Sequence, residues 1–140
     1  MKIALVGSAP SSSGLAPYWD KTFRDFLEGK EQMHPPLIHG EERWEIWGCS
    51  PGAAGQVGRA TRWFEVHRWE PGREWFQPAY IEFLKRFKGP VYTGRGVPEI
   101  PMCRVYPLAL IQGVFSSYFL TSRLALMMAL AILEIEMIRN

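Results

Sequence analysis

The opening of the chain constrains its fold more than any other segment. Residues 2–7 form a short, largely apolar run of β-prone side chains, which passes directly into a loop of Gly, Ser and Pro that reaches Gly14. A short apolar run bounded by turn residues is typical of a strand buried on both faces, as in a parallel sheet. At the carboxyl end of such a strand, a loop of this composition can hold an anion on its backbone N–H groups.

Strand and helix signals alternate along the rest of the chain. We expect strands at residues 44–49, 62–69 and 90–93, helices at 17–27, 53–60, 78–87 and 118–133, and loops at 29–40 and 94–101. Such alternation favours a parallel sheet with helices on its faces. We therefore predict a single α/β domain over residues 1–140, with a three-layer, Rossmann-like fold and a mostly parallel sheet of about four or five strands. In these folds ligands bind beyond the carboxyl ends of the strands, where the strand order reverses.

Composition limits the partners and the location of the protein. The 16 basic and 14 acidic side chains give a formal net charge of +2, which offers no electrostatic argument for a broad nucleic-acid surface. Cys49 and Cys103 form no CxxC pair, and the chain opens without the apolar core of a signal peptide. We interpret both cysteines as reduced thiols and expect a cytoplasmic protein.

Residues 105–122 carry no charge and are the one candidate for a membrane segment. Pro107, Gln112 and Gly113 interrupt the stretch, and Arg123 follows it. A spanning helix needs about 20 mostly apolar residues. We therefore predict buried structure here and no membrane association.

The first loop is the leading candidate for a binding site. Gly7 permits a ligand to approach the backbone closely, and the hydroxyls of Ser8, Ser11 and Ser12 can donate to a phosphate. The loop matches neither GxGxxG nor GxxxxGKS/T, so the dinucleotide and P-loop interpretations do not apply. An ordinary strand-to-helix turn is an equally good interpretation of the local sequence.

Two further candidates follow the next strands. The Gly/Ser/Pro loop at residues 48–52 places Ser50 beside the same predicted edge, although turn composition alone also explains it. Glu65 and His67 lie on one face of a predicted strand, and His67 could meet a phosphate or a base near the strand's carboxyl end. A hydrogen-bonded structural histidine is equally consistent, and we interpret Cys49 as a packed thiol.

The start of the last predicted helix carries hydroxyls and one cation. Thr121, Ser122 and Arg123 suit a phosphate, whereas capping by Thr121 or Ser122 beside a solvated arginine is the alternative. The loop histidines, His34 and His39, have no evident third ligand. We therefore predict no metal site.

These segments together resemble a known family. Residues 3–11 (IALVGSAPS) are similar to the strand–Gly-x-x-Pro-Ser opening of archaeal-type 6-hydroxymethylpterin diphosphokinase-like proteins and of bacterial sialyltransferases that use CMP-sialic acid. Residues 118–122, which run into the apolar stretch 125–132, resemble the Tyr-Phe-x-Ser/Thr-Ser helix start of the same proteins. Residues 47–51 and 63–67 are also similar to phage and prophage proteins of this Rossmann-like type.

The resemblance implies a set of nucleotide contacts. In the sialyltransferases the first loop and the Thr/Ser-rich loop contact the nucleotide, which here implies Gly7, Ser8, Pro10, Ser11, Thr121 and Ser122. Arg123 stands where relatives have a small residue. The relatives continue after the last helix into a strand and further catalytic segments that carry the general base. Residues 134–140 would supply only the beginning of that strand.

We therefore predict a nucleotide or nucleotide-sugar binding domain related to glycosyl and diphosphoryl transferases. Its phosphate would lie on the first loop and the start of the last helix, with Ser50 and His67 nearby. The sequence leaves open the cofactor, the reaction and whether transferase activity is retained. The alternative is a non-enzymatic, phage-encoded interaction protein, which would form a homodimer or cover a host protein, for example in counter-defence.

Overall fold

A parallel sheet forms the centre of the molecule. The computed structural model describes residues 2–7, 37–39, 42–49, 60–116 and 120–140. Five parallel strands follow one another across the sheet: β1 (Lys2–Val6), β3 (Glu42–Cys49), β4 (Arg62–Glu65), β5 (Val91–Thr93) and β6 (Cys103–Val105). The short strand β2 (Leu37–His39) pairs with the first part of β3 in the antiparallel direction. The predicted Rossmann-like α/β fold with a mostly parallel sheet is confirmed.

The register of the sheet brings the carboxyl ends of its strands to one edge. Val6, Gly48, Trp63, Val91 and Cys103 form one row across all five parallel strands. The segments that follow β4 and β5 therefore emerge side by side, at the same edge as Gly7 after β1. Among the described strands the order follows the chain, so the reversal of strand order that we expected at a ligand site does not occur within them.

Alternation along the strands produces two cores, one on each face of the sheet. Ile46 and Trp63 pack into the first core, and their neighbours Trp47 and Phe64 pack into the second. All four side chains are at least 98% buried, with Ile46 the most exposed at 2%. The opposite orientations of Trp63 and Phe64 follow from the two-residue period of a strand.

Helix α4 (Pro78–Arg86) covers the first face. Its apolar stripe places Tyr80, Phe83 and Leu84 against the sheet, and the Phe83 ring meets Trp63 edge-on with 4.6 Å between centroids. Pro78 suits the first turn because its missing N–H would have no helical partner there. Each large apolar side chain buried in this way stabilises the fold by about 1.5–3 kcal/mol. The predicted helix at 78–87 is confirmed.

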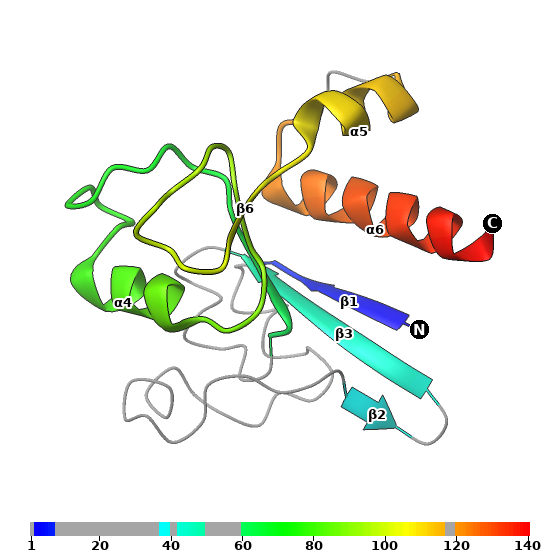
Figure 1. The fold of residues 1–140 in the computed structure, drawn as a ribbon, viewed down its shortest axis with the longest axis horizontal. Coiled ribbons are helices and arrows are strands. Elements are labelled where there is room, and N and C mark those ends of the chain that lie inside the picture. Colours follow the sequence, from blue (N-terminus) through cyan, green and yellow to red (C-terminus); the bar gives the residue numbers. More distant parts are fainter. Residues whose placement is uncertain (1, 8–36, 40–41, 50–59, 117–119) are drawn as a thin grey trace.

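Helix α6 (Arg123–Arg139) covers the second face, and α5 (Leu108–Phe115) lies beside its beginning (Figure 1). The buried residues of α6 are Met127, Ala129, Leu130 and Ala131. The Oγ of Ser122 accepts a hydrogen bond from the backbone N–H of Ala125 at 3.1 Å, so the predicted cap is confirmed.

Several boundaries differ from the prediction. Residues 134–139, expected to begin a strand, continue α6, where they are strong helix formers. The strand expected at 62–69 ends at Glu65, because the Glu65 carboxylate accepts the backbone N–H of His67 and turns the chain. Strands β2 and β6 and helix α5 were not predicted, and β2 lies in a segment expected to be a loop. The helix expected at 17–27 lies outside the described residues, as does the helix expected at 53–60 except for its last residue, Ala60.

Within the described ranges, none of the helices is both long and apolar enough to cross a membrane.

Candidate functional site

A buried carboxylate marks the carboxyl end of β4. The side chain of Glu65 is 1% exposed, and its two carboxylate oxygens accept hydrogen bonds from Tyr80 and His67. Its Oε2 accepts the hydroxyl of Tyr80 at 2.6 Å, and the Tyr80 oxygen accepts the indole N–H of Trp63 at 3.0 Å. Its Oε1 accepts the backbone N–H of His67 at 3.1 Å and lies within hydrogen-bonding distance of His67 Nδ1. A buried charge is tolerated only with such partners.

The direction of these hydrogen bonds fixes the state of the imidazole. Burial, and then the negative charge of Glu65, raises the pKa of Tyr80 well above its ordinary value. Tyr80 therefore keeps its proton and donates it to Glu65. Because both Glu65 oxygens act as acceptors, His67 donates from Nδ1. With the Nδ1 proton directed at Glu65, Nε2 is the ring nitrogen that can accept a hydrogen bond or a proton.

Arg123 contacts the ring of His67. Its Nη1 lies 3.0 Å from Nε2 and 3.2 Å from Nδ1. One nitrogen cannot lie along both in-plane lone-pair directions of an imidazole, so the guanidinium rests against the ring rather than forming two hydrogen bonds. The ring of Trp75 is also adjacent, with 5.1 Å between its centroid and that of His67. His67 is thus held by an anion, a cation and an aromatic ring.

A hollow opens beside this histidine. It has a volume of about 390 Å³ and is lined by Val66, His67, Arg68, Gly94 and Arg95. Glu65 pairs with Thr93 across the sheet, and His67 and Arg95 each follow that pair by two residues, so they leave adjacent strands together. The hollow therefore lies at the carboxyl edge, where α/β sheets bind their ligands.

The cations around the hollow differ in their partners. Arg68 Nε lies 3.2 Å from Glu70 Oε1, a largely exposed pair. Arg95 is exposed and forms no ion pair with any other described residue. The buried Thr93 donates its hydroxyl to the Arg95 carbonyl at 2.6 Å, which orders the loop that carries this arginine. The hollow thus presents positive charge on an ordered loop.

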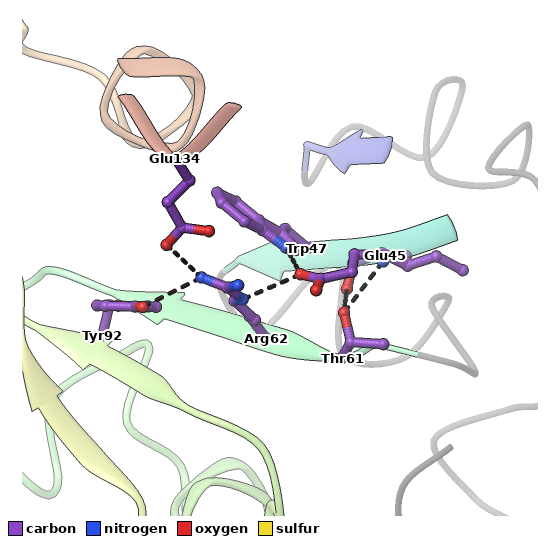
Figure 2. Close-up of polar contacts among 7 residues, drawn as sticks. Glu45, Trp47, Thr61, Arg62, Tyr92 and Glu134 are labelled. Atoms are coloured by element: carbon purple, nitrogen blue, oxygen red, sulfur yellow. Dashed lines mark hydrogen bonds and ion pairs between the residues drawn. The ribbon is translucent and has the colours of Figure 1, made fainter. Parts of the chain in front are cut away.

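A second polar network lies between the sheet and α6, on the face that α6 covers (Figure 2). Arg62 bridges Glu45 of β3 (Nε–Oε2, 3.0 Å) and Glu134 of α6 (Nη1–Oε1, 2.6 Å), and it donates to Tyr92 at 3.3 Å. The indole N–H of Trp47 donates to the same Glu45 oxygen at 2.8 Å. Burial alone would lower the pKa of Arg62, but the carboxylates of Glu134 and Glu45 raise it above its ordinary value. This network attaches α6 to the sheet.

The structure brings some of the predicted site residues together. His67 and Arg123, chosen from separate segments, are in contact. Thr121 is exposed beside the helix start, and Ser122 uses its oxygen to cap α6. Gly7 follows β1 at the same edge of the sheet as His67. Because β3 lies between β1 and β4, the two residues are separated by about 10 Å measured across the strands. Ser8, Pro10, Ser11, Ser12 and Ser50 lie outside the described residues, so their roles stay predictions.

Sequence reasoning missed part of this site. It paired Glu65 with His67 but gave no role to Tyr80, because that residue belongs to the apolar stripe of another element. It also passed over Arg68 and Arg95. The Gly-Arg-Gly run at 94–96, directly after a predicted strand, was the available signal for Arg95.

Two further observations concern possible metal ligands and Cys49. The described residues contain no group of three or more His, Cys, Asp or Glu side chains that could hold a metal ion. Cys49 is 3% exposed and its thiol donates to the Val6 carbonyl at 3.6 Å, as a packed thiol would. Neither feature adds chemistry to the hollow.

Comparison of the chain with protein-family models, with curated proteins and with solved structures gave no match. Function is therefore inferred from the chemistry of the residues at the carboxyl edge.

Proposed function

We propose that this protein binds a nucleotide or nucleotide-sugar at the carboxyl edge of its sheet. The observation that carries the proposal is the contact of Arg123 with His67, which lines a hollow together with Arg68 and Arg95. Guanidinium groups on ordered elements bind phosphate oxygens through charge-assisted hydrogen bonds. The whole chain has a net charge of only +2, so this concentration of cations is local.

An aromatic surface supports a nucleotide over a simple anion. Trp75 is 38% exposed and lies next to His67, which places a flat apolar ring near the cations. A nucleotide has both parts that such a site would take, a base that stacks and a phosphate that carries charge. The proposed ligand would also meet Gly7 and the loop that follows it, as the family resemblance implies.

Isothermal titration with CMP, CDP, GTP and ATP tests this proposal. We expect at least one of these to bind. Arg123→Ala should weaken its affinity by about 10- to 100-fold, because a charge-assisted hydrogen bond contributes roughly 1.5–3 kcal/mol. Arg139→Ala is the matched control, since it removes an arginine from the other end of α6, where the partner is Glu136. Absence of heat from all four nucleotides would contradict the proposal.

A second candidate is an interaction protein that associates with another copy of itself. Exposed apolar side chains gather on α5 and α6: Leu108, Leu110, Val114, Leu124, Met128 and Ile132. A hollow of about 370 Å³ between these helices is lined by apolar residues, including Phe115 and Ile132. The pattern favours a second copy because one uncharged face covers another without leaving a charge buried.

Light scattering distinguishes this candidate. Self-association would give a mass about twice the 16.1 kDa of the chain, and Met128→Asp would restore the monomer. A monomeric mass for the unmodified protein would exclude a homodimer through this face.

A further inference from the structure

We infer that the Glu65–His67 pair makes the proposed nucleotide site hydrolytic: His67 Nε2 takes the proton of a water molecule that attacks a terminal phosphorus of a bound nucleoside diphosphate or triphosphate. The inference rests on the proposed function and names the reaction at the same site. Glu65 acts in it as a positioning residue.

The carboxylate of Glu65 fixes the imidazole for this task. Glu65 is buried, its Oε2 is held by Tyr80 at 2.6 Å, and its Oε1 faces His67 Nδ1. A carboxylate on Nδ1 selects one tautomer, orients the ring and stabilises the imidazolium that forms when Nε2 gains a proton. A histidine that served only to fill space would not need a carboxylate held by the Tyr80 hydroxyl, whose oxygen in turn accepts the Trp63 indole N–H.

The surroundings of Nε2 suit a phosphorylated substrate. His67 is about one-third exposed and lines the hollow, so water can reach the ring. Arg123 rests on the ring, and Arg95 emerges from the adjacent strand at the same level. Phosphate oxygens bound by these arginines would place the phosphorus within reach of a water hydrogen-bonded to Nε2.

The reaction balances without any further reactant. The water oxygen forms a bond to the terminal phosphorus as its proton passes to His67 Nε2. The bond between that phosphorus and the bridging oxygen breaks, and its electron pair leaves with the shortened nucleotide. Positive charge on Arg123 and Arg95 compensates the charge that develops on the phosphoryl oxygens. The imidazolium then returns its proton to the leaving oxygen or to solvent, and inorganic phosphate is released.

Phosphate release from ATP, GTP and CDP, with and without Mg²⁺, tests the inference. We expect release by the unmodified protein from a nucleotide that it binds. His67→Gln should lower kcat by about 100- to 10,000-fold, the usual contribution of a general base. Its calorimetric affinity should stay within a few-fold of the original. His39→Gln is the matched control, because β2 pairs with the beginning of β3 at the amino edge of the sheet.

Glu65→Gln separates positioning from structure. We expect a fall in kcat of about 10- to 1,000-fold and a displaced acidic limb of the pH–rate profile, since the amide no longer stabilises the imidazolium. Glu65 and Arg123 are the charged groups in contact with His67 within the described residues, so Arg123→Ala provides the second pH profile. Glu82→Gln, on the exposed face of α4, is the control. If Glu65→Gln does not fold, as circular dichroism would show, His67→Gln carries the test.

Each result decides between the two proposals. Binding without phosphate release, or release that His67→Gln leaves unchanged, would overturn the hydrolytic role and leave nucleotide binding intact. Absence of both binding and release would overturn the proposed function together with this inference. Release that His67→Gln abolishes while binding persists would support both.

Discussion

Arg62 Nη1 lies 2.6 Å from Glu134 Oε1, and this ion pair joins the amino end of β4 to the second half of α6 (Figure 2). Five residues beyond Arg62, His67 meets Arg123 at the start of the same helix. Eleven residues separate Arg123 from Glu134, so these two contacts lie about three turns apart along α6. α6 is therefore attached near its start to the segment that follows β4 and in its second half to the first residue of β4.

Removing one carboxylate from the Arg62 network tests this attachment. Glu134→Gln should lower the free energy of unfolding by about 1–2 kcal/mol, because Arg62 is desolvated and loses its shortest partner. Urea denaturation measures the change. Glu136→Gln removes a carboxylate two residues away that has only an exposed partner, Arg139, at 3.5 Å, and should change stability by less than about 0.5 kcal/mol. Equal effects of the two substitutions would contradict the attachment.

Removing the arginine itself should cost more. Among the described residues, Arg62→Met leaves the buried Glu45 with only the Trp47 indole N–H, and an unpaired buried charge costs about 3–5 kcal/mol. Adding Glu45→Gln should recover part of that loss, since the remaining group is then uncharged. Chemical denaturation of the two single variants and the double variant gives the coupling energy. Strictly additive losses would argue against an interaction between these residues.

The parallel sheet was predictable because its signals are local. Runs such as residues 2–6 and 44–49 are short, apolar and bounded by turn residues, and this pattern favours buried strands wherever it occurs. Strand β6 was not predictable in the same way. It is three residues long and includes Arg104, and it is held in place through long-range pairing with β5. Short edge strands of this kind depend on the strand beside them rather than on their own sequence.

The candidate site likewise depends on local sequence signals for its residues and on long-range contacts for their arrangement. His67 and Arg123 could be chosen from local sequence, one near a strand end and one at a helix start. Their contact depends on a crossover that brings α6 back over β4, and no local pattern encodes it. Tyr80 and Glu134 escaped notice for a related reason. Tyr80 belongs to a helix whose apolar periodicity explains it, and Glu134 was expected to begin a strand; only the folded chain shows that each reaches a charge on the sheet.

Two glycines should respond in opposite directions to the same substitution. A methyl group at Gly48 would overlap the indole ring of Trp63, which packs across the backbone of the neighbouring strand. Gly48→Ala should therefore destabilise the protein by about 1–3 kcal/mol, the usual cost of overpacking a core. Gly113 lies in α5 with open space around it, and Gly113→Ala should stabilise by about 0.5–1 kcal/mol. If Gly48→Ala leaves the free energy of unfolding unchanged, the Trp63 ring is able to move aside.

Alkaline solutions should weaken the fold through buried tyrosines. Burial raises the pKa of Tyr106 from its ordinary 10.0 to about 12, and its hydroxyl donates to the Leu126 carbonyl at 2.8 Å. Below pH 10 both the folded and the unfolded chain keep this proton, so the contribution to stability is fully present. Between pH 10 and about 12 the unfolded chain ionises first, and the free energy of unfolding falls as pH rises.

Tyr106→Phe separates this effect from general alkaline denaturation. The variant should be less stable than the original by about 1 kcal/mol at neutral pH, because the Leu126 carbonyl loses its partner. Its stability should then decline less steeply above pH 10. A residual decline is expected, since burial also raises the pKa values of Tyr80 and Tyr92. Urea denaturation across this pH range measures both slopes, and identical slopes would exclude Tyr106 as a source of the pH dependence.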